Sequence, residues 1–502
     1  MNSFNLLTEN WIPVQQHGQF ETISLKRLLC KDEDWQICLS RDDMELAALQ
    51  LIVCLVQVVF MPKDEDELLT AYKKPMDEAD YDKGVKPFME WFDLLHPEFP
   101  FMQRNDVKTD KLKSIQALLV GLPEKTSSSA SSHKFFNEVE EVTGLNIGLA
   151  AIILFNRAIN SPSEGGGFKG SLRGGSPATT LIAEERLRQT IWCNVLTQEN
   201  IQKRYPNFAI DPKNDLPTWI DCIIPNSEFY SYNIGFRRGL FWQPAKIKLA
   251  IENNQVIGIE TEKMNYKLKD EPDKRWLHPH SPKKWSGLEG KREEKYLSFT
   301  TTAPAWTQLS TILFKEEMEK EGHEPSLVII QYRDIFRGKT LQLIVGGYRI
   351  NKAKIEQRRH ELLSLAQGWD DKNGQTYLKY LVVLGLNYRT ELRNKLYGLA
   401  KKMGGEHGLI GLSDKGQELF YQQSESLIHN QFAQIDWQQA DQKMILFKKS
   451  LNQLCKNIFD QLVLPYEHDP KFLSAIVNSR AGLNAALRKI EENIMNKYDE
   501  KK

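Results

Sequence analysis

The sequence predicts an α+β protein, with a large mixed α/β domain over residues 1–370 followed by an all-α four-helix bundle over residues 371–502. Two observations lead to this prediction. Short strand-like runs alternate with apolar helical segments through the first domain. Beyond residue 370 the apolar residues recur with a period of about 3.6 and form separate stripes, as they do in amphipathic helices.

The first elements are expected to be two short strands and a core helix. Residues 11–14 and 22–25 have the pattern of strands, and residues 44–61 that of an apolar helix. Gln50 and Gln57 interrupt this apolar run, so it is too polar for a membrane span and predicts a helix of the protein core.

The middle of the chain continues the mixed pattern. A helix is expected over residues 145–158, and a mixed strand and helix over 179–198. Alternation of Ile and Leu with Lys predicts a β-hairpin over 245–260. The apolar runs at 327–332 and 341–345 are expected to form two further strands.

The C-terminal stripes are expected to form four helices. They lie around residues 381–399, 418–432, 444–462 and 473–494. Asp469-Pro470 supplies the cap and the first residue of the last helix. Short turns between the helices are typical of a bundle, and the stripes are expected to form its core.

Composition limits the possible chemistry. Lys plus Arg equals Asp plus Glu at 66 each, so nucleic-acid binding would have to depend on local patches of charge. The six cysteines form no CxxC pair and lie mostly in apolar runs, which indicates buried thiols in a reducing compartment. The N-terminus has no basic segment followed by an apolar core, so we expect a cytoplasmic protein.

The most informative stretch is residues 160–177, which contain six glycines and two prolines. Glycines let the backbone approach a ligand closely, and Lys169 and Arg173 add charge for phosphates. We interpret the stretch as a contact loop, with a flexible surface loop that has no ligand as the alternative. Its spacing matches neither of the two common phosphate-binding glycine motifs.

Three other segments are candidates for contact with a ligand. Phe135 and Phe136 follow the serine-rich run 125–134, where they either anchor a loop to the core or meet a base. The charged segment 263–292 has the composition of a solvated face. Residues 346–352, Gly-Gly-Tyr-Arg-Ile-Asn-Lys, offer a polar tip at the end of a strand.

No catalytic arrangement stands out. His278-Pro279-His280 is the best metal candidate, but no carboxylate or third histidine has the spacing of a metal site, so we expect no metal and no cofactor. Asp42 and Asp43 are explained by capping of the core helix. No Ser-His-Asp, Cys-His or HExxH pattern is evident, which favours a binding protein over an enzyme.

Seven stretches, in one order along the chain, carry a specific resemblance to a known family. They are residues 6–14, 41–49, 165–177, 238–245, 278–282, 299–308 and 346–349. Over essentially its full length the sequence resembles the large-subunit family, CasA, of the type I-E CRISPR surveillance complex, Cascade. The resemblance implies a mixed α/β domain followed by a four-helix bundle, and no cleavage by this chain itself.

The resemblance also implies a function and partners. A CRISPR RNA reads the target by base pairing, while the large subunit reads a short protospacer-adjacent motif in double-stranded DNA, a division of labour that also holds for other RNA-guided effectors. Reading occurs in the minor groove and leads to local strand opening, the start of an R-loop. The other Cascade subunits and a recruited helicase-nuclease are the implied protein partners, and no membrane is involved.

Individual residues take roles from the same resemblance. The glycine loop corresponds to Ser163, Glu164, Gly165 and Gly166, the lysine finger to Lys267, and the aromatic loop to Phe135 and Asn137. The wedge, usually glutamine after asparagine, is here Lys352 after Asn351. Together with Lys169 and Arg349, these residues make up the predicted DNA-binding set. In the bundle, five cations are candidates for contact with the opened strand: Lys401, Lys402, Lys448, Lys449 and Arg488.

Physical chemistry supports these roles. The minor groove offers mostly acceptors, which suit lysine and amide donors. A wedge costs a few kcal/mol of unstacking, which phosphate contacts offset. Two alternatives stay open at this point: an enzyme that uses the glycine loop to bind nucleotide phosphates, and a purely structural scaffold subunit.

Overall fold

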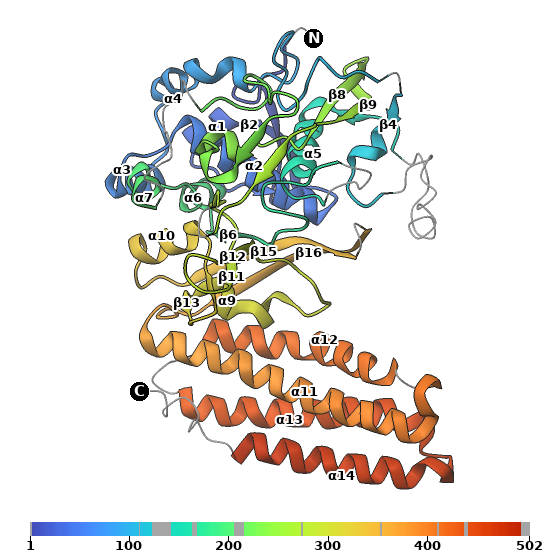
Figure 1. Ribbon diagram of the computed structural model, residues 1–502. Helices are drawn as coiled ribbons and strands as arrows, with labels where there is room; N and C mark the ends of the chain where they lie inside the picture. Colours follow the sequence, from blue (N-terminus) through green and yellow to red (C-terminus); the bar gives the residue numbers. More distant parts are fainter. Residues whose placement is uncertain are drawn as a thin grey trace. The chain divides into compact units, whose positions relative to one another are not determined.

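The computed structural model describes residues 3–109, 111–122, 142–162, 168–204, 215–272, 275–351, 354–408, 411–435 and 440–492 (Figure 1). It has a mixed α/β fold and a helical C-terminal region, which confirms the predicted fold class. The chain divides into two compact units. The first comprises residues 1–301, 311–337 and 343–362, and the second 302–310, 338–342 and 363–502.

The first unit begins with the predicted strands. β1 (Asn10–Gln16) pairs antiparallel with β2 (Gln19–Ser24), and β3 (Gln36–Ile37) pairs with the other edge of β1. His17 and Gly18 make the turn with φ of 50° and 80°, as a tight hairpin requires. Ser24 then caps α1 (Leu25–Cys30) by accepting from the Arg27 backbone N–H at 3.1 Å.

The predicted core helix is α2 (Asp42–Val59), and its residues 43–58 are buried except for Glu45. Its two glutamines are buried as well. The amide nitrogen of Gln57 donates to the Leu196 carbonyl at 3.0 Å, and its amide oxygen accepts from the Leu196 backbone N–H at 2.6 Å. Protein partners therefore satisfy this polar group inside the core. In the described part of the chain, no helix is both long and apolar enough to cross a membrane.

The predicted hairpin is β8 (Ala245–Glu252) and β9 (Gln255–Lys263), which pair antiparallel. Asn253 and Asn254 form its turn with φ of 49° and 60°. β4 (Lys113–Ser114) and β5 (Leu145–Asn146) also pair with β9. The helix predicted over residues 145–158 is α5 (Ile147–Ile159), which follows β5 and packs on α2.

Three further sheets contain the other strands. β7 (Glu228–Tyr230) pairs in parallel with β10 (Lys267–Lys269). β15 (Leu341–Asn351) lies between β16 (Lys354–Leu365) and β6 (Thr179–Ala183). Of these strands, β15 begins and β16 ends in residues assigned to the second unit. The last sheet has the order β12 (Glu293–Tyr296), β11 (Lys283–Ser286), β14 (Glu321–Glu324) and β13 (Glu316–Glu317).

One predicted strand is wrong. Residues 327–332 belong to a helix, α10 (Leu327–Ile335), whereas 341–345 are in β15 as predicted. All six residues of 327–332 are buried. A short, continuously apolar run fits a buried helix and a buried strand equally well, so periodicity could not separate them.

The first unit contains further short helices. They are α3 (Glu65–Lys73), α4 (Glu78–Val85), η1 (Lys86–Trp91), η2 (Ile115–Leu118), α6 (Leu187–Cys193), α7 (Gln198–Arg204), η4 (Ser231–Asn233), α8 (Phe236–Leu240) and α9 (Leu309–Leu313), the last of which begins in the second unit. The cysteines are buried as expected, except for the half-buried Cys38 and the exposed Cys222.

The second unit contains four long helices that run side by side (Figure 1). They are α11 (Lys372–Gly408), α12 (Gly411–Gln434), α13 (Ala440–Val463) and α14 (Pro470–Glu492), with η5 (Ala305–Gln308) and η6 (Leu464–Tyr466) as short additions. The Asp469 carboxylate accepts from the Lys471 N–H at 2.9 Å at the start of α14. Trp306 of η5 is fully buried in this unit, with its ring centroid 6.2 Å from that of Tyr421.

The five bundle cations do not share one environment. Lys401, Lys402, Lys449 and Arg488 are exposed. Lys448 is buried, and its ammonium lies 5.6 Å from the centre of the Tyr380 ring. Lys448 is therefore packed inside the bundle and is not on its surface.

Candidate nucleic-acid interface

The structure describes four of the predicted DNA-binding residues: Lys169, Lys267, Arg349 and Asn351. The other seven lie outside the described residues, namely Phe135, Asn137, Ser163, Glu164, Gly165, Gly166 and Lys352. The residues that lead into and out of these segments are described, and they show what holds each segment at its ends.

Lys267 lies at an exposed edge and shares a carboxylate with Lys269. β10 places Lys267 opposite Glu228 of β7. The Lys269 ammonium is 2.5 Å from one oxygen of Glu228, and the Lys267 ammonium is 2.9 Å from the other. Hydrogen bonds from Lys269 and Lys267 lower the pKa of Glu228 to about 2, so the acid stays ionised. The Lys267 side chain is 74% exposed and can reach a ligand.

Arg349 and Asn351 also share one acid. Both residues lie on β15, and Glu356 lies on the neighbouring strand β16. The Arg349 guanidinium pairs with one oxygen of Glu356, and the Asn351 amide donates to the other at 2.9 Å. These contacts link the two strands on either side of residues 352–353. The last described donors before the wedge position are thus held in place by a single carboxylate.

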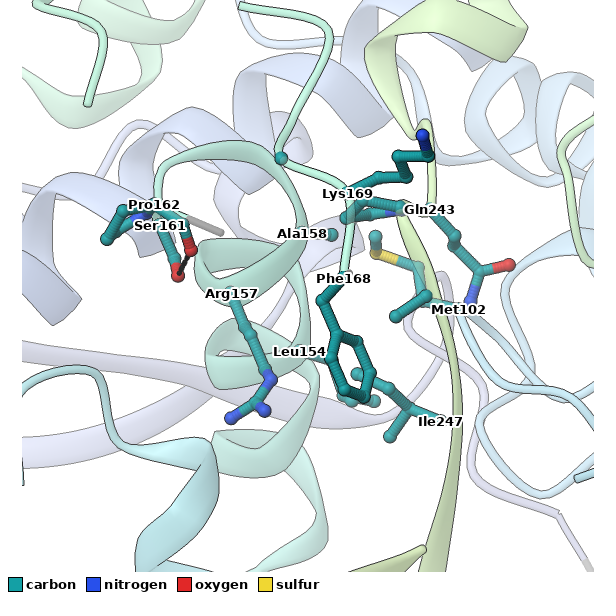
Figure 2. A pocket seen from close by; sticks show the side chains of 13 residues that line it. Met102, Leu154, Arg157, Ala158, Ser161, Pro162, Phe168, Lys169, Gln243 and Ile247 are labelled. Atoms are coloured by element: carbon teal, nitrogen blue, oxygen red, sulfur yellow. Dashed lines mark hydrogen bonds between the residues drawn. The ribbon is translucent and has the colours of Figure 1, made fainter. Parts of the chain in front are cut away.

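Lys169 follows an aromatic residue that lines a pocket. In Figure 2, the Phe168 ring points toward Leu154 of α5 and Ile247 of β8, whereas Lys169 extends away from them. The Lys169 ammonium lies 5.9 Å from the centre of the Tyr266 ring. Phe168 therefore anchors the chain directly after the glycine loop, and Lys169 meets the residue next to Lys267.

Two more lysines approach the same aromatic ring. The ammonium groups of Lys113 and Lys263 lie 5.9 and 5.7 Å from the centre of Phe168. Cations over an aromatic face are attracted by its quadrupole, which holds long side chains that otherwise move freely. The cations around Phe168 and the 263–269 segment, which we call the basic patch, are Lys113, Lys169, Lys263, Lys267 and Lys269.

Comparison with known proteins identifies the family. Residues 5–458 match the family of CRISPR-associated protein Cse1. This chain belongs to the Cse1 family. The resemblance to CasA found in the sequence is thereby confirmed, because CasA and Cse1 are two names of one protein in the solved structures.

Solved structures of Cse1 proteins share the fold. Thermus thermophilus CasA (Cse1) is 16% identical, with a TM-score of 0.75 over 97% of this chain and 100% of that one. Thermobifida fusca Cse1 is 17% identical, with a TM-score of 0.76 over 98% of each chain. A chain of a CRISPR RNA-guided surveillance complex is 12% identical, with a TM-score of 0.68 over 96% of this chain and 100% of that one.

Arg173 differs from the expectation that the composition of the glycine-rich stretch gave. The sequence suggested a phosphate contact, but the residue is only 3% exposed. Its guanidinium donates to the hydroxyls of Thr179 at 3.0 Å and Ser281 at 2.7 Å. Burial lowers its pKa to about 9, which leaves it protonated at neutral pH. Arg173 is thus a buried structural cation that fixes the end of the glycine-rich stretch.

His278 and His280 are also buried, and protein groups lie next to the Nδ1 atom of each ring, whereas the Nε2 atom of His278 has no hydrogen-bond partner among the described residues. The His278 Nδ1 accepts from the His280 backbone N–H at 3.1 Å, and the His280 Nδ1 lies 3.5 Å from the Gln50 amide. Burial, with the nearby Arg173 charge, lowers the pKa of His280 to about 3. Within the described ranges, no three His, Cys, Asp or Glu side chains are grouped to hold a metal ion.

The sequence analysis did not single out three members of the basic patch. It treated 263–292 as a solvated face, so Lys263 and Lys269 were not singled out, and Lys113 lies far away in the sequence. One available signal was the alternation of lysine with aromatic and apolar residues over 263–269. The position of Lys113 beside Phe168 depends on the pairing of β4 with β9, which no local pattern reveals.

Proposed function

We propose that this chain is the non-catalytic large subunit of a CRISPR RNA-guided surveillance complex in the cytoplasm. In this role it recognises the protospacer-adjacent motif in double-stranded DNA through the minor groove and promotes strand opening for guide RNA pairing. It also helps to recruit the helicase-nuclease. Membership of the Cse1 family and a fold shared with a chain of such a complex support the assignment.

The observation that carries the DNA-binding part is the exposed pair Lys267 and Lys269 at Glu228. Each ammonium has three donors, and the carboxylate occupies part of this capacity. Groove acceptors and backbone phosphates offer the same chemistry as the carboxylate. A DNA duplex can therefore exchange with Glu228 as the partner of these lysines without leaving a buried charge behind.

The hairpin formed by β15 and β16 supports the wedge part of the proposal. Arg349 and Asn351 are held by Glu356, so the described end of β15 is tied to β16. A side chain that is pushed into a base stack must be held by a rigid support, since unstacking costs a few kcal/mol. The paired strands provide such a support, and the cations of the basic patch supply phosphate contacts that offset the cost.

The test compares Lys267→Ala with Lys295→Ala in the complex reconstituted with its partner subunits and guide RNA. Lys295 is a matched control, because it is also exposed and also pairs with one acid, Glu293, at 2.8 Å. We expect Lys267→Ala to reduce the preference for duplexes that carry the motif by roughly tenfold, as for loss of a specific groove contact. Lys295→Ala should keep that preference. Equal preference in both variants would refute the assignment of Lys267.

A further inference from the structure

The hydroxyl of Tyr348 lies at the centre of a buried chain of hydrogen bonds. It donates to a carboxylate oxygen of Asp43 at 2.8 Å and accepts from the amide nitrogen of Asn156 at 2.7 Å. Tyr348, Asp43 and Asn156 are 1%, 4% and 1% exposed. These residues belong to β15, α2 and α5, so one hydroxyl joins three elements that are distant in the sequence.

On the side of α5 the chain of bonds continues to Arg173. The amide oxygen of Asn156 accepts from the Asn160 amide at 3.0 Å. The Asn160 oxygen in turn accepts from the Arg173 guanidinium, which also donates to the Ile159 carbonyl at 3.1 Å. Asn160 and Arg173 therefore connect the two sides of the glycine-rich stretch below its surface.

On the side of α2 the chain of bonds reaches Val120. Asp43 accepts from the Arg41 guanidinium at 2.9 and 2.7 Å through its two oxygens. The same Arg41 guanidinium donates to the Val120 carbonyl at 2.8 Å. The sequence suggested that Asp43 caps α2, but the N-cap is Arg41, whose side chain does not cap the helix; Asp43 instead joins Arg41 to Tyr348.

We call the connected set Val120, Arg41, Asp43, Tyr348, Asn156, Asn160 and Arg173 the polar relay. It contains residues close in sequence to three of the segments that carry predicted DNA-binding residues, but no printed bond joins it to Lys267. Val120 precedes the segment with Phe135 and Asn137, and Asn160 and Arg173 flank the glycine loop. Tyr348 comes three residues before Asn351.

We propose that Tyr348 is a positioning residue whose hydroxyl couples these segments, so that motif discrimination depends on a group that does not contact DNA. The part on motif discrimination rests on the proposed function, whereas the coupling of the segments does not. A buried hydrogen-bonded network has one favoured arrangement, because each bonded donor or acceptor that loses its partner is left unsatisfied. Water cannot replace the hydroxyl easily at a site that is 1% exposed.

The ionisation state of the hydroxyl suits this role. Burial and the neighbouring Asp43 carboxylate raise the pKa of Tyr348 well above its ordinary value. The group therefore stays protonated at physiological pH, where it donates to Asp43 and accepts from Asn156 at the same time.

The first test is amide hydrogen exchange of the full chain in Tyr348→Phe, which keeps the ring and removes only the hydroxyl. The control is Tyr332→Phe, because Tyr332 is also buried and also donates to a carboxylate, Glu184, at 3.0 Å. The reporter amides are those of Asn160 and Ser161, both bonded to the Asn156 carbonyl.

We expect Tyr348→Phe to speed exchange of these two amides about tenfold, the size of one lost hydrogen bond, and Tyr332→Phe to leave them unchanged. Unchanged exchange in Tyr348→Phe overturns the relay. Equal acceleration in both variants also overturns it, because it would reflect a general loss of stability and no specific coupling.

The second test is motif discrimination by the reconstituted complex. Tyr348→Phe should lower the ratio of affinities for motif-bearing and motif-lacking duplexes by about tenfold while assembly is retained, and Tyr332→Phe should match the wild type. If the wild type discriminates and Tyr348→Phe does so equally well, the positioning role is wrong. If the wild type does not discriminate, the proposed function fails, and hydrogen exchange alone decides the relay.

Discussion

The ammonium of Lys267 lies 2.9 Å from an oxygen of Glu228, and the other oxygen of this acid is occupied by Lys269. One carboxylate thus partly neutralises two lysines at an exposed sheet edge. DNA that approaches this edge has to replace Glu228. Under the proposed function, this acid therefore opposes DNA binding with little regard to sequence.

Removing this acid should strengthen DNA binding with little regard to sequence. In Glu228→Gln, Lys267 and Lys269 lose their ionic partner and are free to contact phosphates. We expect a severalfold higher affinity for both motif-bearing and motif-lacking duplexes. The plot of log affinity against log salt should steepen by about one for each additional phosphate contact.

Binding titrations of the reconstituted complex at several salt concentrations measure this effect. Glu293→Gln is the control, since it frees the exposed Lys295 outside the basic patch. An affinity that is unchanged or lower in Glu228→Gln would show that the Lys267 and Lys269 edge does not face DNA.

Glu356 should matter for strand opening more than for initial binding. In Glu356→Gln the charge that holds Arg349 is lost and the contact with Asn351 is weakened, so the support of the wedge loosens. We expect opening to slow by roughly fivefold, which corresponds to about 1 kcal/mol for a weakened contact of this kind.

Fluorescence of a base analogue placed next to the motif reports the opening rate. Glu317→Gln is a suitable control, because Glu317 forms a comparable ion pair with Arg292 at 2.7 Å on another sheet. Equal rates in wild type and Glu356→Gln would mean that the described end of this hairpin does not support the wedge.

Stability should fall in mild acid because of the buried histidines. The pKa of His280 drops from its ordinary value of 6.5 to about 3 on folding, mainly through burial, and that of His278 is lowered as well. Between these pH values the unfolded chain binds a proton that the folded chain does not. Their contribution to the free energy of unfolding is therefore fully present above pH 6.5. As the pH falls below this value, the free energy of unfolding decreases by about 1.4 kcal/mol per pH unit for each such histidine.

Urea unfolding at pH 7, 6 and 5 tests this linkage. In His280→Gln the decline of the unfolding free energy below pH 6.5 should be shallower than in the wild type by about 1.4 kcal/mol per pH unit. Parallel pH profiles for the two proteins would show that His280 does not resist protonation in the fold.

Local patterns in the sequence revealed much of the fold. The hairpin at Asn253 and Asn254 and the start of α14 at Pro470 follow from turn and cap chemistry, which depends on near neighbours. The run 327–332 was misjudged, because its uniformly apolar residues carry no period. Pattern analysis therefore failed at a segment that is buried on all sides, because such a segment has no polar face to contrast with its apolar face.

The candidate site was less accessible to sequence reasoning. Asp43 and Tyr348 are 305 positions apart, and no local signal connects them. Arg173 seemed available for phosphates, since its glycine-rich context is typical of an exposed loop, yet it is buried by partners elsewhere in the chain. Lys267 was identified through family resemblance, whereas its acid partner Glu228 became evident only from the pairing of β7 with β10.

The most direct test of motif recognition is selection from duplexes that carry one target sequence and randomised flanking positions, with the reconstituted complex. We predict that the wild type enriches a small set of related flanking motifs, and that a Lys267→Ala, Lys352→Ala double variant assembles normally but loses this enrichment. Flanks that stay random with the wild type, or an enrichment that persists unchanged in the double variant, would contradict recognition of the motif by this chain.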